Sequence, residues 1–145
     1  MKMRRGLIRN CKERGEWAEL CFMARAAGCG LRVSKPYGDS ASYDVGVECE
    51  GRILRVQVKS TLYRRRGIES YSLNVHGPRR RLYRRGSVDF FAVYLIPRDT
   101  WYILPFGKMG GNFSLHFTPG GKRGKWEEYR EAWELLRGGR DGKKS

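Results

Sequence analysis

The sequence predicts an α/β fold, and three observations support this. Apolar residues recur at helical spacing over residues 12–27. Two runs rich in Val, Ile and Leu flank the dipeptide Glu50-Gly51, and a residue followed by Gly commonly fills a two-residue hairpin turn. The apolar run over residues 88–96 is typical of a buried interior strand. Together these elements favour a layered α/β architecture.

The first helix is expected over residues 12–27, before glycines that suit its C-terminal cap. Its apolar residues form two stripes, the first made of Trp17, Leu20, Cys21, Ala24 and Ala27 and the second of Phe22, Met23 and Ala26. Glu19 lies within the second stripe. A helix that is apolar nearly all round is expected to be buried, and a buried carboxylate needs a partner. Two partners stay open for Glu19, a metal ion or a salt bridge to an arginine.

The hairpin around Glu50-Gly51 has a register that its own pattern supports. With these residues in the turn, the opposed apolar pairs are Val47–Leu54 and Val45–Val56. A slip of one residue would mix apolar and charged side chains on both faces, so the apolar pattern favours this register. The same register sets Asp44 opposite Gln57, and Lys59 follows on the same face.

An acid, an amide and an amine therefore come together at one end of the hairpin. A carboxylate at a strand end is a suitable oxygen ligand for Mg²⁺, which prefers few protein ligands and several waters. Lys59 could orient or deprotonate an attacking water, or neutralise charge on a phosphate. The alternative is an ordinary cross-strand ion pair between Asp44 and Lys59, with Gln57 in solvent.

The remaining elements follow in chain order. We expect short strands at 31–35, 70–75, 101–104 and 113–117, a loop at 36–42, and a short basic helix at 79–85. A final helix at about 125–137 would place five apolar residues on one side: Trp126, Tyr129, Ala132, Trp133 and Leu136. We expect one domain over residues 1–137, followed by a disordered basic tail at 138–145.

The charge balance indicates a polyanionic partner. The 145 residues include 30 Lys and Arg against 15 Asp and Glu, a net charge of +15, which is far more than solubility requires. No apolar run is long enough to span a membrane, and no apolar segment of a signal peptide follows the basic N-terminus, so we expect a cytoplasmic protein. The four cysteines are widely spaced, and we expect reduced core residues rather than zinc ligands.

The arginines are clustered in a way that predicts contact with nucleic acid. The expected DNA-binding residues are Arg64, Arg65, Arg66, Arg79, Arg80, Arg81, Arg84 and Arg85. Guanidinium groups pair well with phosphate, and Tyr63, Tyr71 and Tyr83 lie among these groups. The alternative is a solvated charged face, but charges of one sign at this density repel each other without a partner.

Asp44, followed on the next strand by Gln57-x-Lys59, resembles the signature of the PD-(D/E)XK nucleases. Two positions differ from the general pattern, since Tyr43 stands where a Pro is usual and Gln57 replaces the second acid. The segments at 34–39, 43–44, 55–61 and 88–105 are similar to the group I intron homing endonucleases of this fold. Those enzymes also carry Gln at the second position. The resemblance extends over residues 12–106.

The resemblance implies a restriction-endonuclease-like core of αβββαβ type, in which helices flank a mixed central β-sheet. It also implies a metal-dependent DNA endonuclease that uses Mg²⁺, with Mn²⁺ as a substitute. The family places an acid on the first helix four residues after a Gly, which identifies Glu19 after Gly15. The implied catalytic residues are Glu19, Asp44, Gln57 and Lys59. The implied metal ligands are Asp44, Glu19 and the backbone carbonyl of Val58.

Two other functions stay open from the sequence, a structure-selective nuclease such as a Holliday-junction resolvase and a basic nucleic-acid-binding module without catalysis. One active site cuts one strand, so we expect double-stranded DNA to be cut by a homodimer or a larger even assembly. The aromatics of the expected last helix, together with Trp101 and Tyr102, would serve as core or as the contact between copies.

Overall fold

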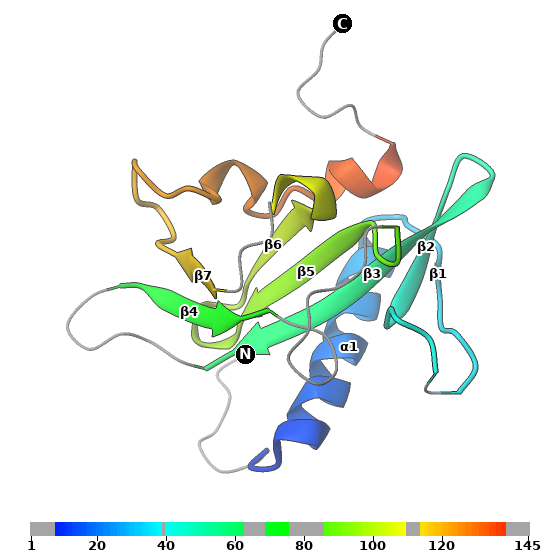
Figure 1. The fold of residues 1–145 in the computed structure, drawn as a ribbon, viewed down its shortest axis with the longest axis horizontal. Helices are drawn as coiled ribbons and strands as arrows, with labels where there is room; N and C mark the ends of the chain where they lie inside the picture. Colours follow the sequence, from blue (N-terminus) through cyan, green and yellow to red (C-terminus); the bar gives the residue numbers. More distant parts are fainter. Residues whose placement is uncertain (1–7, 39, 63–68, 76–85, 110–113, 139–145) are drawn as a thin grey trace, which may run out of the picture.

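The computed structural model describes residues 8–38, 40–62, 69–75, 86–109 and 114–138. Its regular elements are one α-helix and seven strands within these residues (Figure 1): α1 (Cys11–Gly28), β1 (Val33–Ser34), β2 (Val45–Cys49), β3 (Arg52–Thr61), β4 (Tyr71–Asn74), β5 (Phe90–Leu95), β6 (Thr100–Pro105) and β7 (Ser114–Phe117). Short 3₁₀ helices complete it: η2 (Ile96–Arg98), η3 (Phe106–Lys108), η4 (Glu127–Tyr129) and η5 (Trp133–Arg137).

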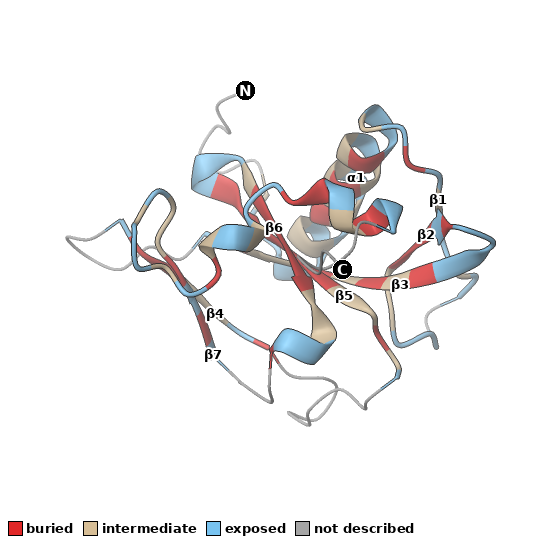
Figure 2. Ribbon diagram, turned by 90° about the horizontal axis from the view of Figure 1, so that it is seen from above, coloured by how far each residue is buried: buried red, intermediate tan, exposed pale blue. Residues whose placement is uncertain are grey.

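The central sheet is mixed and has the strand order β1-β2-β3-β5-β6. Only the contact between β3 and β5 is parallel, and the other neighbours in this sheet are antiparallel. Strands β4 and β7 form a separate antiparallel pair. Helix α1 packs on one face of the central sheet, and the β4–β7 pair lies on the other side, as the edge-on view in Figure 2 makes visible. The expected α/β architecture with a mixed sheet is confirmed.

Strand β5 is apolar throughout because both of its faces are buried. Ala92 and Tyr94 contribute to the core under α1, whereas Phe91, Val93 and Leu95 contribute to the core under β4 and β7. Successive side chains of a strand point to opposite faces, so a strand covered on both sides needs an uninterrupted apolar run. The predicted interior strand at 88–96 is confirmed on this basis.

The predicted hairpin forms with the predicted register. Val45 pairs with Val56 and Cys49 with Arg52. Glu50 and Gly51 in the turn have φ angles of 45° and 81°, as a type I′ turn requires at both central positions. Alternate residues of β3 are buried under α1, while the residues between them are only half-buried. Because side chains alternate between the two faces of a strand, the half-buried polar residues between the buried ones lie on the face away from α1.

Helix α1 is buried on one side only, which differs from the expectation of a helix buried all round. The side chain of Asn10 caps its start by accepting hydrogen bonds from the N–H groups of Lys12 and Glu13 at 2.8 and 3.2 Å. The stripe of Phe22 and Ala26 is buried, but Leu20 in the other predicted stripe is 62% exposed. Trp17 and Cys21 of that stripe are only partly buried against the core. Because α1 packs on a sheet face rather than between two layers, its far side stays in solvent.

The predicted helix at 125–137 is wrong, although the burial of its apolar residues is largely confirmed. Trp126, Ala132, Trp133 and Leu136 are buried, and Tyr129 is half-buried. Two short 3₁₀ helices replace the α-helix, with Glu131 between them at a positive φ of 51°.

Glu131 explains this break. Its N–H donates to the carbonyl of Trp101 at 2.7 Å, and its carboxylate accepts from the N–H of Trp101 at 2.7 Å. The carboxylate also accepts from the indole N–H of Trp133 at 2.8 Å. These bonds satisfy polar backbone groups on the edge strand β6 and replace the bonds that a continuous helix would form.

The structure also bears on the expectations for the aromatic residues, the cysteines and the arginine clusters. Tyr71, Trp101 and Tyr102 are fully buried, so Tyr71 is not a surface contact for nucleic acid and the other two belong to the core. All four cysteines are free, but Cys11 is exposed and is therefore not the core residue that was expected. The arginine clusters at 64–66, 79–81 and 84–85, the helix at 79–85 and the tail from 139 lie outside the described residues. No helix in the described part of the chain is long and apolar enough to cross a membrane.

Candidate active site

Asp44 lies directly before β2 and is attached to β3 by two hydrogen bonds. Its N–H donates to the carbonyl of Val56 at 2.9 Å, and its carboxylate Oδ2 accepts from the N–H of Val58 at 2.9 Å. The side chain therefore extends the ladder between β2 and β3 by one bond beyond the last paired residues. This bond fixes the direction of the carboxylate relative to β3.

Gln57 and Lys59 lie on the neighbouring strand and are half-buried. They alternate with Val56 and Val58, which are buried in the core under α1. Both sit where β3 pairs with β5, Gln57 beside Phe91 and Lys59 beside Val93. Gln57 is only partly exposed to solvent, and the charges of Asp44 and Lys59 interact, as the alternative of a cross-strand ion pair also expects.

Glu19 approaches the same place from α1, and its partner is a lysine rather than an arginine. It forms an ion pair with the ammonium group of Lys35, which directly follows β1. The Nζ atom of Lys35 also donates to the backbone carbonyl of Asp44 at 3.4 Å. The side chain of Glu19 is 20% exposed and that of Lys35 is 49% exposed. Lys35 thus connects the acid on the helix to the residue directly before β2.

Sequence reasoning missed Lys35. Strand β1 places it here, because Ser34 pairs with Gly46 two residues beyond Asp44. A two-residue strand has too few side chains to show its register by an apolar pattern. The signal that the sequence did contain was the position of Lys35 between a predicted strand and a predicted loop, inside a segment that resembles the homing endonucleases.

Burial and neighbouring charges shift the pKa values of two charged groups in the site, Asp44 and Lys59. Burial raises the pKa of Asp44, and the negative charge of Glu19 raises it further, while the Val58 N–H, Lys59 and Lys35 oppose this rise. Burial lowers the pKa of Lys59, with the charge of Asp44 opposing. An acid and an amine that are both pushed toward their neutral forms in a shared site are typical of functional centres.

The oxygen atoms present suit a hard divalent cation. Two carboxylates, an amide and a backbone carbonyl are available on Asp44, Glu19, Gln57 and Val58, and such oxygens are the ligands that Mg²⁺ prefers. Lys35 and Lys59 oppose the repulsion between the two carboxylates. The described residues hold no group of three or more His, Cys, Asp or Glu side chains that could bind a metal ion by themselves. A cation here would therefore rely on the amide, the carbonyl and water for its remaining ligands.

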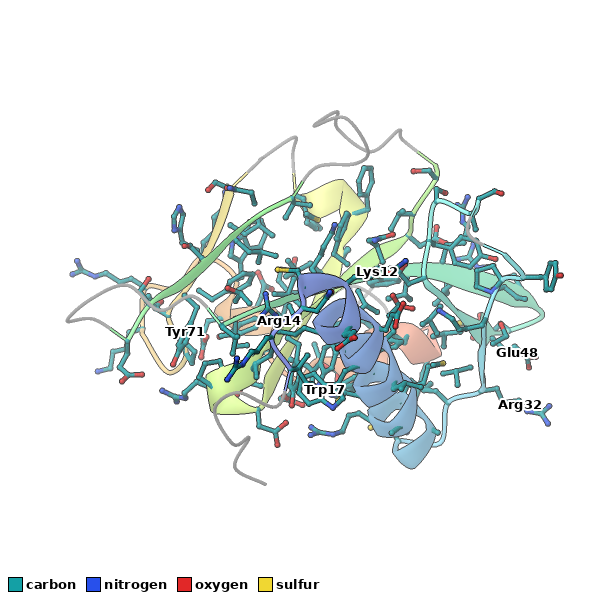
Figure 3. All side chains as sticks on the ribbon, turned by 90° about the horizontal axis from the view of Figure 1, so that it is seen from below. Lys12, Arg14, Trp17, Arg32, Glu48 and Tyr71 are labelled. Atoms are coloured by element: carbon teal, nitrogen blue, oxygen red, sulfur yellow. The ribbon has the colours of Figure 1, made fainter. Side chains whose placement is uncertain are left out.

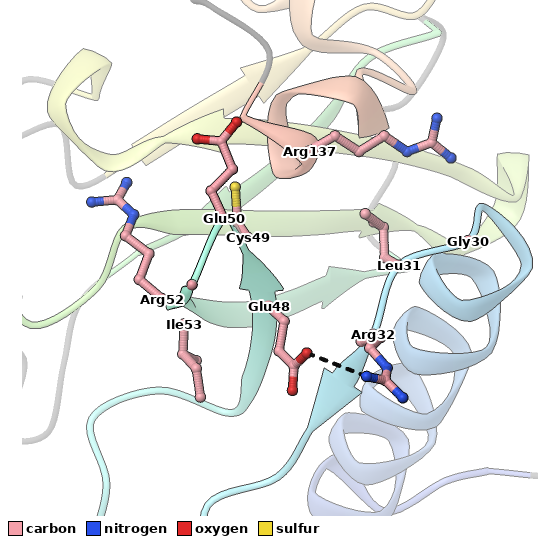
Figure 4. A pocket seen from close by; sticks show the side chains of 10 residues that line it. Gly30, Leu31, Arg32, Glu48, Cys49, Glu50, Arg52, Ile53 and Arg137 are labelled. Atoms are coloured by element: carbon pink, nitrogen blue, oxygen red, sulfur yellow. Dashed lines mark ion pairs between the residues drawn. The ribbon is translucent and has the colours of Figure 1, made fainter.

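A separate pocket of about 630 Å³ lies at the other end of the hairpin (Figure 4). It is lined by the turn residues together with Gly30, Arg32, Glu48 and Arg137. Arg32 and Glu48 form an ion pair there at 3.9 Å, well away from the start of α1, as the labelled side chains in Figure 3 make visible. Asp44 precedes the first residue of β2, whereas this pocket begins at its last residues, so the pocket is distinct from the candidate active site.

Comparison with known proteins identifies the family. The model of the PD-(D/E)XK endonuclease family matches residues 9–136, which is most of the chain. The chain belongs to the PD-(D/E)XK endonuclease family. It is therefore a nuclease, and the resemblance and the restriction-endonuclease-like fold inferred from the sequence are confirmed.

A solved structure supports the same placement. The bacterial homing endonuclease I-Ssp6803I is similar to this PD-(D/E)XK nuclease at a TM-score of 0.72 and 29% sequence identity. The match covers 89% of this chain and 92% of that chain. No significant match was found among the curated proteins.

Proposed function

We propose that the chain is a metal-dependent endonuclease that hydrolyses phosphodiester bonds in double-stranded DNA, and that it acts as a homing-type enzyme. The observation that carries this proposal is the Asp44 carboxylate, which the Val58 N–H fixes beside Glu19 and Lys59. Family membership and the printed title of the similar structure support it. The net charge of +15 suits a polyanionic substrate.

Each residue of the site has a proposed role. Asp44 and Glu19 would hold Mg²⁺, for which Mn²⁺ could substitute, with the amide oxygen of Gln57 and the carbonyl of Val58 as further ligands. When bound, the ion would polarise the phosphate and lower the pKa of a bound water. Lys59 would face the scissile phosphate, where its ammonium group stabilises the charge that develops during attack.

Assembly and DNA contact belong to the same proposal. Two copies related by a two-fold axis would place one active site on each strand, so we propose a homodimer or a larger even assembly. Because Trp101, Tyr102, Trp126 and Trp133 are buried in the core, the contact between copies would use other residues. The arginines at 64–66, 79–81 and 84–85 would bind phosphate.

The decisive experiment replaces Asp44 with Asn. Asn can still accept the hydrogen bond from the Val58 N–H but carries no charge, so Asp44→Asn should abolish cleavage while DNA affinity is unchanged or raised. Cleavage kinetics and DNA binding should be measured in parallel.

Asp99→Asn is the matched control, because it removes the same charge at an exposed residue whose left-handed backbone, with φ of 46°, suits Asn. It should cleave like the wild type. An Asp44→Asn protein that cuts DNA at the wild-type rate would refute the assignment.

A further inference from the structure

Lys35 holds a position that the proposed catalytic set does not explain. Its ammonium group is paired with Glu19 and reaches the backbone carbonyl of Asp44 at 3.4 Å. A positive charge therefore already lies against one of the two carboxylates that are proposed to bind the metal ion. The sequence motif of the family gives Lys35 no role, and Lys59 is the lysine that the motif contains.

An ammonium group and a divalent cation cannot share Glu19 without repulsion. Both favour the same carboxylate oxygens, and both are drawn by the negative charge that Glu19 and Asp44 produce together. Either cation can neutralise the negative charge of the mostly buried Glu19 carboxylate. Binding of one cation at Glu19 therefore disfavours binding of the other.

The two partners differ in their freedom to move. Glu19 belongs to the middle of α1 and its side chain is mostly buried, whereas the side chain of Lys35 is about half exposed and follows a two-residue strand. A lysine has a flexible stem and can carry its charge into solvent without moving the backbone. Lys35 is thus the group that can leave.

We propose that Lys35 is an internal counter-ion that competes with the divalent cation for Glu19 and lowers the affinity of the DNA-free protein for metal. This inference rests on the proposed function, because it takes Glu19 and Asp44 as metal ligands. Lys35 is a positioning residue here, since it acts on the ion through Glu19.

The test is Mn²⁺ binding to the 145-residue chain without DNA, monitored by electron paramagnetic resonance of the free ion. Lys35→Met should tighten Mn²⁺ binding about fivefold, as expected for the loss of a competing ion pair near the surface. Lys122→Met is the matched control, because it removes the same charge from an exposed residue in the loop after β7, and it should leave the affinity within about twofold. Lys35→Arg keeps the charge and should bind Mn²⁺ like the wild type.

A double variant separates competition at Glu19 from a general charge effect. If Lys35 acts through Glu19, Lys35→Met should give no gain in a Glu19→Gln background. A gain that persists there, or an equal gain in Lys122→Met, would overturn the inference. Circular dichroism should confirm that each variant is folded, and Lys35→Gln serves in place of Lys35→Met if the latter is not.

The Asp44→Asn protein distinguishes failure of this inference from failure of the proposed function. If Asp44→Asn removes Mn²⁺ binding but Lys35→Met binds like the wild type, only the role of Lys35 is refuted. If Asp44→Asn binds Mn²⁺ as the wild type does, the proposed metal site is refuted and the role of Lys35 with it.

Discussion

The two ends of the β2–β3 hairpin both carry charged residues, but they differ in burial and in how many elements meet there. At the Asp44 end, acids and amines come from α1, β3 and the segments that flank β1 and β2, and burial shifts the pKa values of Asp44 and Lys59. At the turn end, Arg32 and Glu48 form an exposed ion pair beside an open pocket.

A pocket and a set of charges do not by themselves mark a catalytic site. The turn end has the pocket, but its charged groups are solvated, and ion pairs of this kind contribute little energy. The Asp44 end brings charges of both signs together where water is partly excluded, and electrostatic interactions are stronger there. Chemistry at a phosphate needs the second environment.

The largest expected difference between the two ends is in catalysis. Lys59→Met should lower the cleavage rate by about 100-fold or more, because it removes the ammonium group that we propose faces the reacting phosphate. DNA affinity should change little, because Lys59 is one of 30 basic residues. Arg52→Met is the counterpart at the turn end, where Arg52 is exposed, and it should leave the cleavage rate nearly unchanged.

Single-turnover cleavage and equilibrium DNA binding measure the two quantities separately. A Lys59→Met protein whose defect lay mainly in affinity would make Lys59 an ordinary phosphate contact. A large loss of cleavage in Arg52→Met would move the functional centre to the turn end.

The next difference is in stability. The free energy of unfolding of Asp44→Ala should be about 1–3 kcal/mol lower than that of Asp44→Asn, because Ala leaves the buried N–H of Val58 without its acceptor. At the turn end, the free energies of unfolding of Glu48→Ala and Glu48→Gln should differ by about 0.5 kcal/mol or less, since Glu48 is exposed. Urea unfolding of the four proteins gives both differences. Equal differences at the two ends would mean that the Asp44–Val58 bond does not anchor the site.

The sequence was sufficient where local chemistry determines structure. The apolar alternation and the Glu50-Gly51 turn specify the hairpin register, and that register brings Asp44 next to β3. Helical spacing likewise located α1 and placed Glu19 in the stripe of Phe22 and Ala26, but it did not show that only this side of the helix contains fully buried residues. These features depend on residues close together in the chain, so a pattern read along the sequence contains them.

The sequence was insufficient where distant segments determine structure. The apolar spacing at 125–137 favours a helix, but the free edge of β6 binds Glu131 and breaks it. Lys35 reaches Glu19 only because a two-residue strand pairs with β2. Both outcomes depend on contacts between segments that the sequence pattern does not connect.

The smallest effect concerns pH. The pKa of Asp44 is raised by burial above 3.8 in the folded protein, so its ionised form is less favourable there than in the unfolded chain and weakens the fold at neutral pH. Asp44→Asn should therefore be more stable than the wild type at pH 7. The gain should be full above the folded pKa, decrease as the pH falls through that value, and vanish below 3.8, where Asp44 is protonated in both states. Asp99→Asn, a change at an exposed residue, should give no such gain.

Thermal unfolding of the wild type, Asp44→Asn and Asp99→Asn across this pH range checks the sign. An Asp44→Asn protein less stable than the wild type at pH 7 would mean that Lys35 and Lys59 stabilise the Asp44 carboxylate more than burial destabilises it.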